Sequence, residues 1–254
     1  MWRVMQFLQK WFLLLIVCSD ILGKISRCHD LSSEGMIGRW NQTSTNISLL
    51  MKNVVMKPDD SGGNKIDHFA EYCSNTYRDS VLTGGMATFD VYALPNVNIN
   101  DRSASRITVV NVDPAYETIQ AGWMVNPSVY GDTKTHFFTG WTAKRKGSTV
   151  GCWDLRCDGF VPVNYAPITP GDILDTNNSL LKITIKIFKS KDDGDWWLHF
   201  GYDNNNLRPV GYWPKSLFTS LVDHANGILW GGYTGSYPGK ASPPMGNGQW
   251  LSWI

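Results

Sequence analysis

Apolar and polar residues alternate with period two along several short stretches of this chain, and turn residues separate them. The clearest alternation is at 180–188, where three isoleucines are interleaved with lysine and threonine. A turn at 193–195 and an aromatic-rich stretch at 196–202 follow, which predicts a β-hairpin. Similar patterns predict strands at 87–92, 105–112, 117–125 and 135–142. Many short strands with regular turns indicate an all-β domain, a sandwich or a barrel-like fold.

A single stretch has the pattern of a helix. Pro214 precedes it, Gly227 ends it, and apolar residues within 215–226 recur at helical spacing. These residues are Leu217, Phe218, Leu221 and Ala225. We therefore expect one short helix in an otherwise β-rich chain.

The first 23 residues have the three parts of a secretory signal peptide. Arg3 and Lys10 give a positive start, 11–17 is an apolar core, and cleavage after Ser19 or Gly23 fits the small residues there. A membrane anchor is the alternative, but the apolar run is too short for roughly 30 Å of hydrocarbon. The sequence therefore predicts a secreted, extracellular protein with no membrane partner after the signal is removed.

Residues 24–81 are polar and rich in turns, with a loop at 58–64 and an ambiguous periodicity at 47–55. From about Gly84 onward the strand patterns begin. We expect three parts: a signal peptide (1–23), a short segment (24–81) and a β-domain (82–254).

Composition narrows the classes of function. The chain has 254 residues, 23 basic and 22 acidic, and a net charge of +1. Charges of both signs are interspersed along the chain, so the sequence predicts no basic patch that would bind nucleic acid. No motif predicts a cofactor, and the sequence leaves the oligomeric state open.

The cysteines agree with secretion. Cys18 leaves with the signal, and an even number of cysteines remains. Cys152 and Cys157 flank a tight loop that a disulfide would fix, and Cys28 and Cys73 would then pair by elimination. A zinc site is the alternative, but no histidine lies close in sequence to Cys152 or Cys157, and no metal is expected. N-glycosylation motifs begin at Asn41, Asn46 and Asn177.

Several further motifs occur in one order between about Leu82 and Gln249. They are Ile119-Gln-Ala-Gly-Trp123, Tyr130-Gly-Asp132, Phe138-Thr-Gly-Trp-Thr142, Gly151-Cys152, Cys157-Asp-Gly-Phe160, Asp195-Trp-Trp-Leu198, Gly211-Tyr-Trp-Pro214, Leu217-Phe218, Trp230-Gly-Gly232 and Met245-Gly-Asn-Gly248. With this set the chain resembles the neprosin family, plant secreted glutamic peptidases that cut after proline. The resemblance implies an antiparallel two-sheet β-sandwich, with a groove across one sheet and two catalytic glutamates facing each other. It also implies that 24–81 is a reduced form of the family's pro-region.

This chain departs from the family at both catalytic positions. Gln120 and Tyr233 stand where the resemblance implies the two glutamates. The two-carboxylate chemistry needs one ionised group to accept a proton from water and one protonated group to donate it. An amide does neither at ordinary pH, although it can polarise a carbonyl. A phenol with a pKa near 10 is a poor general base.

The other acids near these motifs are poorly placed to take over from the two glutamates. Glu117 lies three residues before Gln120, an odd spacing that places it on the opposite face of a strand. Asp132 and Asp195 fit turn chemistry. His136, where the family usually has arginine, is expected to be structural or exposed.

Aromatic residues near these motifs could stack on proline rings, and we expect Trp123, Trp141, Tyr212 and Trp230 to line the substrate groove. Most of the other aromatic residues are expected to be core. The sequence thus predicts a secreted neprosin-like protein with impaired peptidase activity that binds proline-containing polypeptide. The alternatives are an active prolyl endopeptidase with an altered site and a structural extracellular protein. A sugar-binding function has no specific support.

Overall fold

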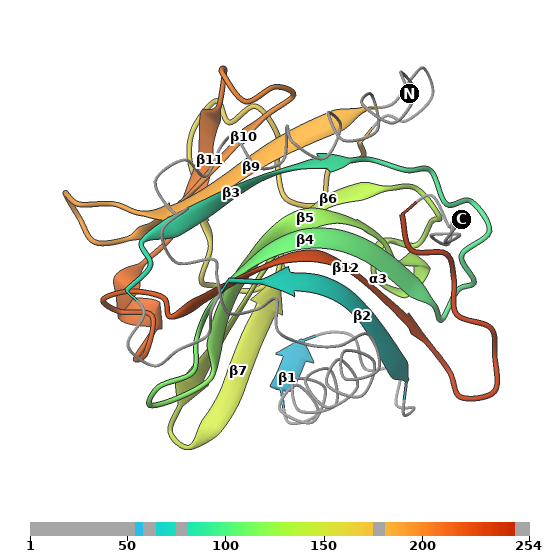
Figure 1. The fold of residues 1–254 in the computed structure, drawn as a ribbon, viewed down its shortest axis with the longest axis horizontal. Helices are drawn as coiled ribbons and strands as arrows, with labels where there is room; N and C mark the ends of the chain where they lie inside the picture. The colour runs from blue at the N-terminus through green and yellow to red at the C-terminus, as the bar shows by residue number, and fades with distance from the viewer. Residues whose placement is uncertain (1–53, 58–64, 75–80, 175–180, 247–254) are drawn as a thin grey trace, which may run out of the picture. The chain divides into compact units, whose positions relative to one another are not determined.

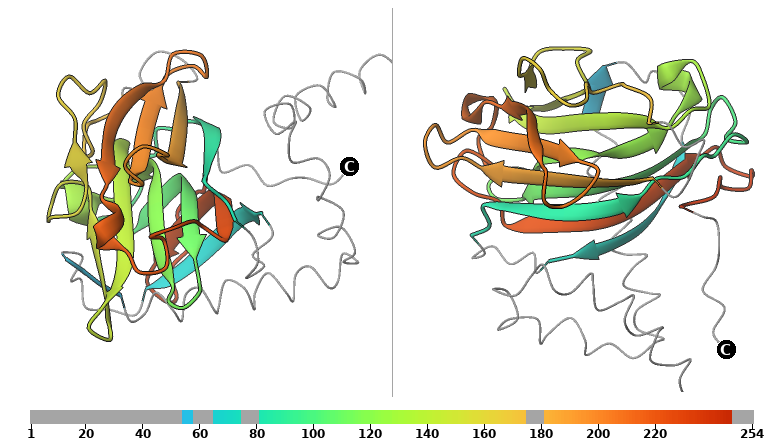
Figure 2. Two further views of the ribbon diagram at one scale, coloured as in Figure 1. Left: turned by 90° about the vertical axis from the view of Figure 1, so that its left-hand side faces the viewer. Right: turned by 90° about the horizontal axis from the view of Figure 1, so that it is seen from above.

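The computed structural model describes residues 54–57, 65–74, 81–174 and 181–246, and everything below concerns these residues. Their strands form two sheets packed face to face (Figures 1 and 2). The predicted all-β sandwich is confirmed.

The larger sheet has seven strands in the order β1-β7-β6-β5-β4-β12-β2. Its strands are β1 (Val54–Lys57), β2 (Ile66–Cys73), β4 (Arg102–Asn111), β5 (Glu117–Val125), β6 (His136–Arg145), β7 (Ser148–Trp153) and β12 (Gly227–Ser236). All neighbours are antiparallel except β1 and β7, which run parallel.

The smaller sheet has five strands in the order β3-β9-β10-β11-β8. They are β3 (Gly84–Asp90), β8 (Val161–Pro162), β9 (Lys182–Lys189), β10 (Trp196–Gly201) and β11 (Arg208–Trp213). The hairpin predicted around 193–195 is present as β9 and β10, with Ile187 opposite Leu198.

The main core lies between the two sheets. The isoleucines at 183, 185 and 187 of β9 point into it, as the alternation predicts, because every second side chain of a strand faces the same way. From the larger sheet, odd-numbered residues of β4 and β5 such as Ile107 and Ile119 meet them. We call this side of the larger sheet its inner face and the opposite side its outer face.

The predicted helix at 215–226 is wrong. The structure has only a 3₁₀ turn there, η2 (Lys215–Leu217), and a short α-helix elsewhere, α3 (Pro127–Tyr130). The backbone amides of Thr219, Ser220 and Leu221 donate to the carboxylate of Glu117. A tertiary contact therefore takes the amides that a helix would use.

Two strands come from the segment 24–81, where no clear strand was expected. β1 pairs with β7, and β2 pairs with β12 over its full length. The segment therefore contributes the strands at both edges of the larger sheet. The function of 24–81 as a reduced pro-region, and the predicted boundary at 82, stay predictions.

Candidate functional site

The outer face of the larger sheet brings Gln120 and Tyr233 onto one surface. Gln120 of β5 lies opposite Thr108 of β4, and Tyr233 of β12 lies opposite Ala104 of the same strand. Opposed residues share a face, so both side chains project away from the core between the sheets. Both are almost fully buried, with exposed fractions of 1% and 3%.

Between them runs a row of residues centred on Arg106. Across the strands this row reads Glu71, Gly231, Arg106, Gly122 and Phe138. Glycine occupies both positions directly opposite Arg106 on the neighbouring strands, Gly231 and Gly122, so neither of these positions adds a side chain to the outer face. A Cβ at Gly231 would also collide with the carbonyl of Ala70, so the close approach of β2 and β12 requires glycine there.

Arg106 connects the residues of this face. Its Nη1 donates to Oε1 of Gln120 at 2.6 Å, and its Nη2 donates to Oε1 of Glu71 at 3.0 Å. Its Nε reaches the same Glu71 oxygen at 3.2 Å. The guanidinium carbon lies 4.3 Å from the centre of the Tyr233 ring, a cation–π contact. One buried cation therefore touches both Gln120 and Tyr233.

Arg106 carries a positive charge in this buried setting. Burial works to lower the pKa of this guanidinium, but the charge of Glu71, the Glu71 hydrogen bond and the nearby tyrosines together outweigh it, so the pKa is raised. With 4% of Arg106 and 7% of Glu71 exposed, the ion pair lies almost out of water. Breaking such a pair from one side is costly, because the remaining charge has no partner.

The Gln120 side chain lies against bare backbone. Its cross-strand neighbour on β6 is Gly140, and a Cβ there would come within 3.1 Å of the Gln120 Cγ. The amide oxygen accepts from Arg106, while the amide nitrogen has no acceptor among the described residues. It remains a hydrogen-bond donor at the centre of the face.

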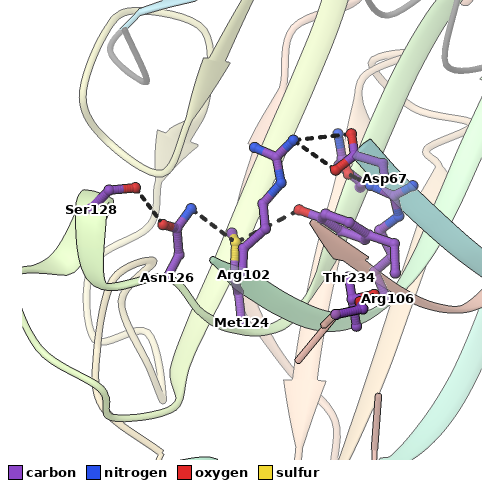
Figure 3. Close-up of polar contacts among 10 residues, drawn as sticks. Asp67, Arg102, Arg106, Met124, Asn126, Ser128 and Thr234 are labelled. Carbon is purple, nitrogen blue, oxygen red and sulfur yellow. Dashed lines mark hydrogen bonds and ion pairs between the residues drawn. The ribbon is translucent and has the colours of Figure 1, made fainter. Parts of the chain in front are cut away.

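Tyr233 is held by apolar and sulfur contacts. Its ring stacks on Phe69 of β2 at 5.8 Å, and its hydroxyl donates to Sδ of Met124 at 3.6 Å. Asn126 donates to the same sulfur and accepts from Ser128 (Figure 3). In this setting the Tyr233 hydroxyl donates to the weak acceptor Sδ of Met124.

A second buried acid lies near the disulfide loop. Asp154 accepts from the Tyr130 hydroxyl at 2.9 Å and from the Thr139 amide at 2.9 Å. Burial raises the pKa of Asp154. Burial also raises the pKa of Tyr130 well above its ordinary value. Each group therefore favours its protonated form more than it would in water.

The other acids and the histidine named from the sequence take structural positions. Glu117 lies on the opposite face from Gln120, as its odd spacing predicts, and its carboxylate accepts from four backbone amides, those of Lys144, Thr219, Ser220 and Leu221. Asp195 accepts from the Lys215 amide in the predicted turn. His136 is buried and bonded to Asp132.

The predicted groove residues are not on this face. Trp123 and Trp141 are buried in the core between the sheets, and Trp230 packs against that core with its indole nitrogen donating to Met86. Tyr212 lies on the smaller sheet and stacks on Trp197. The assignment of these four residues to a groove around Gln120 and Tyr233 is therefore wrong.

Trp123 does line a cavity, but on the inner side of the larger sheet. The cavity measures about 280 Å³ and is bordered by Asp90, Tyr92, Gly232 and Met245, among others. It opens between β3 and β12, on the other side of the sheet from Arg106.

The Cys152–Cys157 disulfide is present. Cys28 lies outside the described residues, so its pairing with Cys73 stays a prediction, as do the signal peptide and the glycosylation sites at Asn41, Asn46 and Asn177, which also lie outside. None of the helices in the described ranges is long and apolar enough to cross a membrane.

A comparison with protein-family models identifies the family. The Neprosin model matches residues 99–253, more than half of the chain. The chain belongs to the neprosin family. The match includes Gln120, Tyr233 and Arg106, and it makes this a peptidase-related protein of an extracellular family. Glu71, which completes the ion pair, lies before the matched range.

Sequence reasoning missed both members of that ion pair in this neprosin-family protein. Arg106 could have been noticed, because a charged residue inside an apolar strand pattern requires a buried partner. Glu71 had no such signal. Its partner is 35 positions away, and only the pairing of β2 with β12 and of β12 with β4 brings the two together.

Proposed function

We propose that this neprosin-family protein is secreted, lacks efficient peptidase activity, and binds proline-containing polypeptide on the outer face of its larger sheet. The observation that carries the proposal is the position of Arg106. A fixed cation, bonded to Gln120 and to Glu71, lies between the two places where the family mechanism needs acids.

The chemistry supports impaired hydrolysis. Gln120 cannot accept a proton from water, and Tyr233 directs its hydroxyl at a sulfur. Glu71 has the right chemistry for a base, but its Oε1 accepts both bonds from Arg106. Arg106 also stands between this carboxylate and Gln120, so Glu71 is poorly placed to activate a water beside the Gln120 amide.

The same residues support binding of an extended peptide. The amide nitrogen of Gln120 can donate to a peptide carbonyl, which every residue, including proline, provides. The partly exposed ring of Phe69, which stacks on the buried ring of Tyr233, offers an apolar contact of the kind that suits pyrrolidine rings. A peptide rich in proline also loses little conformational entropy on binding.

Secretion is supported by the disulfide and by the extracellular nature of the family. Expression of the full chain in a secretory host tests it. We expect the protein in the culture medium with its N-terminus beyond residue 19, and a loss of mass on enzymatic removal of N-linked sugars.

The decisive experiment uses this secreted protein with a proline-rich polypeptide between pH 2 and 8. We expect no cleavage after proline by mass spectrometry, and saturable binding that Gln120→Ala weakens about tenfold, the loss of one hydrogen bond at roughly 1.4 kcal/mol. Cleavage after proline that Gln120→Ala abolishes would refute the inactive assignment. Absence of any binding would instead favour a structural extracellular protein.

One observation favours a second function, an active endopeptidase with an altered site. The carboxylate of Glu71 and the amide of Gln120 are bonded to the same guanidinium, that of Arg106. In that case Glu71 is the base and the Gln120 amide polarises the substrate carbonyl. Any cleavage would then disappear in Glu71→Gln, while the matched substitution Asp67→Asn on the same strand would leave it intact.

A further inference from the structure

Strand β3 is the outermost strand of the smaller sheet (Figure 1). It pairs with β9 on one side, and no strand of the described ranges lies on its other side, which we call its free edge. Backbone bonds between positions 83 and 189 and between positions 91 and 181 place the odd-numbered residues of β3 in the hydrogen-bonded pairs with β9. The N–H and C=O groups of even-numbered residues such as Met86, Thr88 and Asp90 therefore point to the free edge.

Two tryptophans of the larger sheet cover part of this edge. The indole nitrogen of Trp230 donates to the carbonyl oxygen of Met86 at 3.3 Å, and that of Trp123 donates to the carbonyl oxygen of Asp90 at 2.9 Å. Thr88 lies between these two positions, and its N–H and C=O have no hydrogen-bond partner among the residues that the structure describes. An unpaired amide and carbonyl at a strand edge are the groups that an added strand binds.

The cavity between β3 and β12 lies beside Thr88 and measures about 280 Å³. The aromatic residues Phe89, Tyr92 and Trp123 line it, together with Gly231 and Gly232, which bring no side chain into it. The volume is below the roughly 300–1,000 Å³ of sites for drug-sized ligands. We therefore expect the cavity to take one side chain of a larger ligand.

The charge at this cavity is balanced. Asp90 is the charged residue that lines it, and its carboxylate lies 2.7 Å from Nζ of Lys182. The Tyr92 hydroxyl donates to the same carboxylate at 3.4 Å. A cationic group would have to displace Lys182, whereas an apolar group gains from leaving water for contact with aromatic residues. The cavity therefore favours an apolar side chain.

We propose that the free edge of β3 binds an extended polypeptide by antiparallel strand addition, with one residue paired to Thr88 and a neighbouring apolar side chain in the cavity. The paired residue accepts a hydrogen bond from the Thr88 amide and donates one to the Thr88 carbonyl. Opposed residues share a face, and successive side chains alternate between faces. The neighbour of the paired residue therefore points to the inner side, where the cavity lies.

The sequence requirement differs from that of the outer face. Proline has no N–H, so it cannot be the residue that pairs with Thr88. The ligand is thus an extended segment in which an apolar residue adjoins a residue other than proline. This site lies on the other side of the larger sheet from Arg106, and it does not depend on the function proposed above.

Binding of a labelled peptide to the purified full chain tests the site. The peptide is acetylated Ser-Leu-Thr-Leu-Ser with a fluorescent dye, and the control is the same peptide with a methyl group on the threonine nitrogen. By fluorescence polarisation we expect saturable binding of the first and about tenfold weaker binding of the second, which loses one hydrogen bond. Excess proline-rich polypeptide should not displace the peptide. Equal affinities, no binding, or displacement by the proline-rich polypeptide would overturn the proposal.

Two substitutions separate the backbone of Thr88 from its side chain. Thr88→Pro removes the N–H at the free edge, which an edge strand tolerates because this group is outside the β3–β9 ladder. Thr88→Val is the matched control: both variants lose the side-chain bond to Thr184, at 2.8 Å, but valine keeps the N–H. We expect about tenfold weaker peptide binding in Thr88→Pro and little change in Thr88→Val. Equal affinity in the two variants would contradict strand addition.

Amide hydrogen exchange in the unsubstituted chain does not depend on either variant. Without peptide, the Thr88 amide should exchange as an open amide, and saturating Ser-Leu-Thr-Leu-Ser should slow this exchange by about tenfold or more. Protection without peptide, accompanied by dimerisation in sedimentation, would mean that a second copy occupies the edge. Protection in a monomer would mean that other residues of the same chain occupy it. Either result would overturn the proposal.

Discussion

Two buried glutamates on opposite faces of the same sheet are neutralised in different ways. Glu117, on the inner face, accepts hydrogen bonds from backbone amides of the loop before β12 and of β6. Glu71, on the outer face, is satisfied by one side chain, Arg106. Backbone amides are fixed by the fold, whereas a guanidinium can be removed by a single substitution or attracted by another partner.

The difference separates an acid that builds the fold from an acid that belongs to the candidate site. Glu117 fixes the chain at Thr219–Leu221 and has no capacity left for a ligand. Glu71 fixes Arg106, and Arg106 in turn contacts Gln120 and Tyr233. Changes at Glu117 should therefore affect stability, and changes around Glu71 should affect both stability and the chemistry of the outer face.

The largest effect is expected for Glu117→Ala. The substitution leaves buried amides without an acceptor, so we expect a loss of about 3–5 kcal/mol in the free energy of unfolding, measured with urea. Asp195→Ala is the control, because its carboxylate is exposed and accepts an amide of a surface turn. A loss below about 1 kcal/mol at Glu117 would show that the amides find other acceptors and that the two glutamates do not differ as described.

The next effect concerns the ion pair. Glu71→Met leaves the Arg106 charge buried without its partner, and we expect a loss of about 3 kcal/mol. Glu71→Met combined with Arg106→Met removes both charges, and we expect it to recover more than half of that loss. Urea unfolding of the single and double variants measures the coupling. Additive losses in the double variant would mean that the two residues do not act as a pair.

The smallest effect is expected for Gln120→Glu. A carboxylate at this position accepts a charged hydrogen bond from Arg106, so we expect about 1 kcal/mol of added stability at neutral pH. We expect no cleavage of a proline-rich polypeptide, because the new acid is bound to Arg106 and Tyr233 is unchanged. The control is Gln120→Met, which has similar size and no hydrogen bond. Cleavage by Gln120→Glu alone would show that Arg106 does not block the chemistry.

The strand pattern was predictable where a strand buries at least one whole face. The alternation at 180–188 predicted β9 almost to the residue, because this strand packs one face on the core, and 117–125 predicted β5, which is buried on both faces. β2 was missed because it lies at the sheet edge. Its exposed residues alternate with partly buried ones, a weaker signal than burial of one whole face.

The candidate site was predictable in part. The odd spacing that placed Glu117 away from Gln120 applies equally to Trp123, three residues after Gln120, and to Trp230, three residues before Tyr233. Applied to them, it would have put both tryptophans on the inner face, where the structure has them. The error came from expecting aromatic residues near a motif to share its surface.

The sequence by itself determined the all-β class, most strands, the disulfide loop and the family, because each depends on residues close together in the chain or on motifs in a fixed order. Only the tertiary structure decided that Glu71 and Arg106 form a pair, that Arg106 touches Gln120 and Tyr233, and that Glu117 prevents a helix at 219–221. These contacts join distant strands through the register of the sheet. Register is set by how all strands bury their apolar faces together, and no single stretch of sequence contains that information.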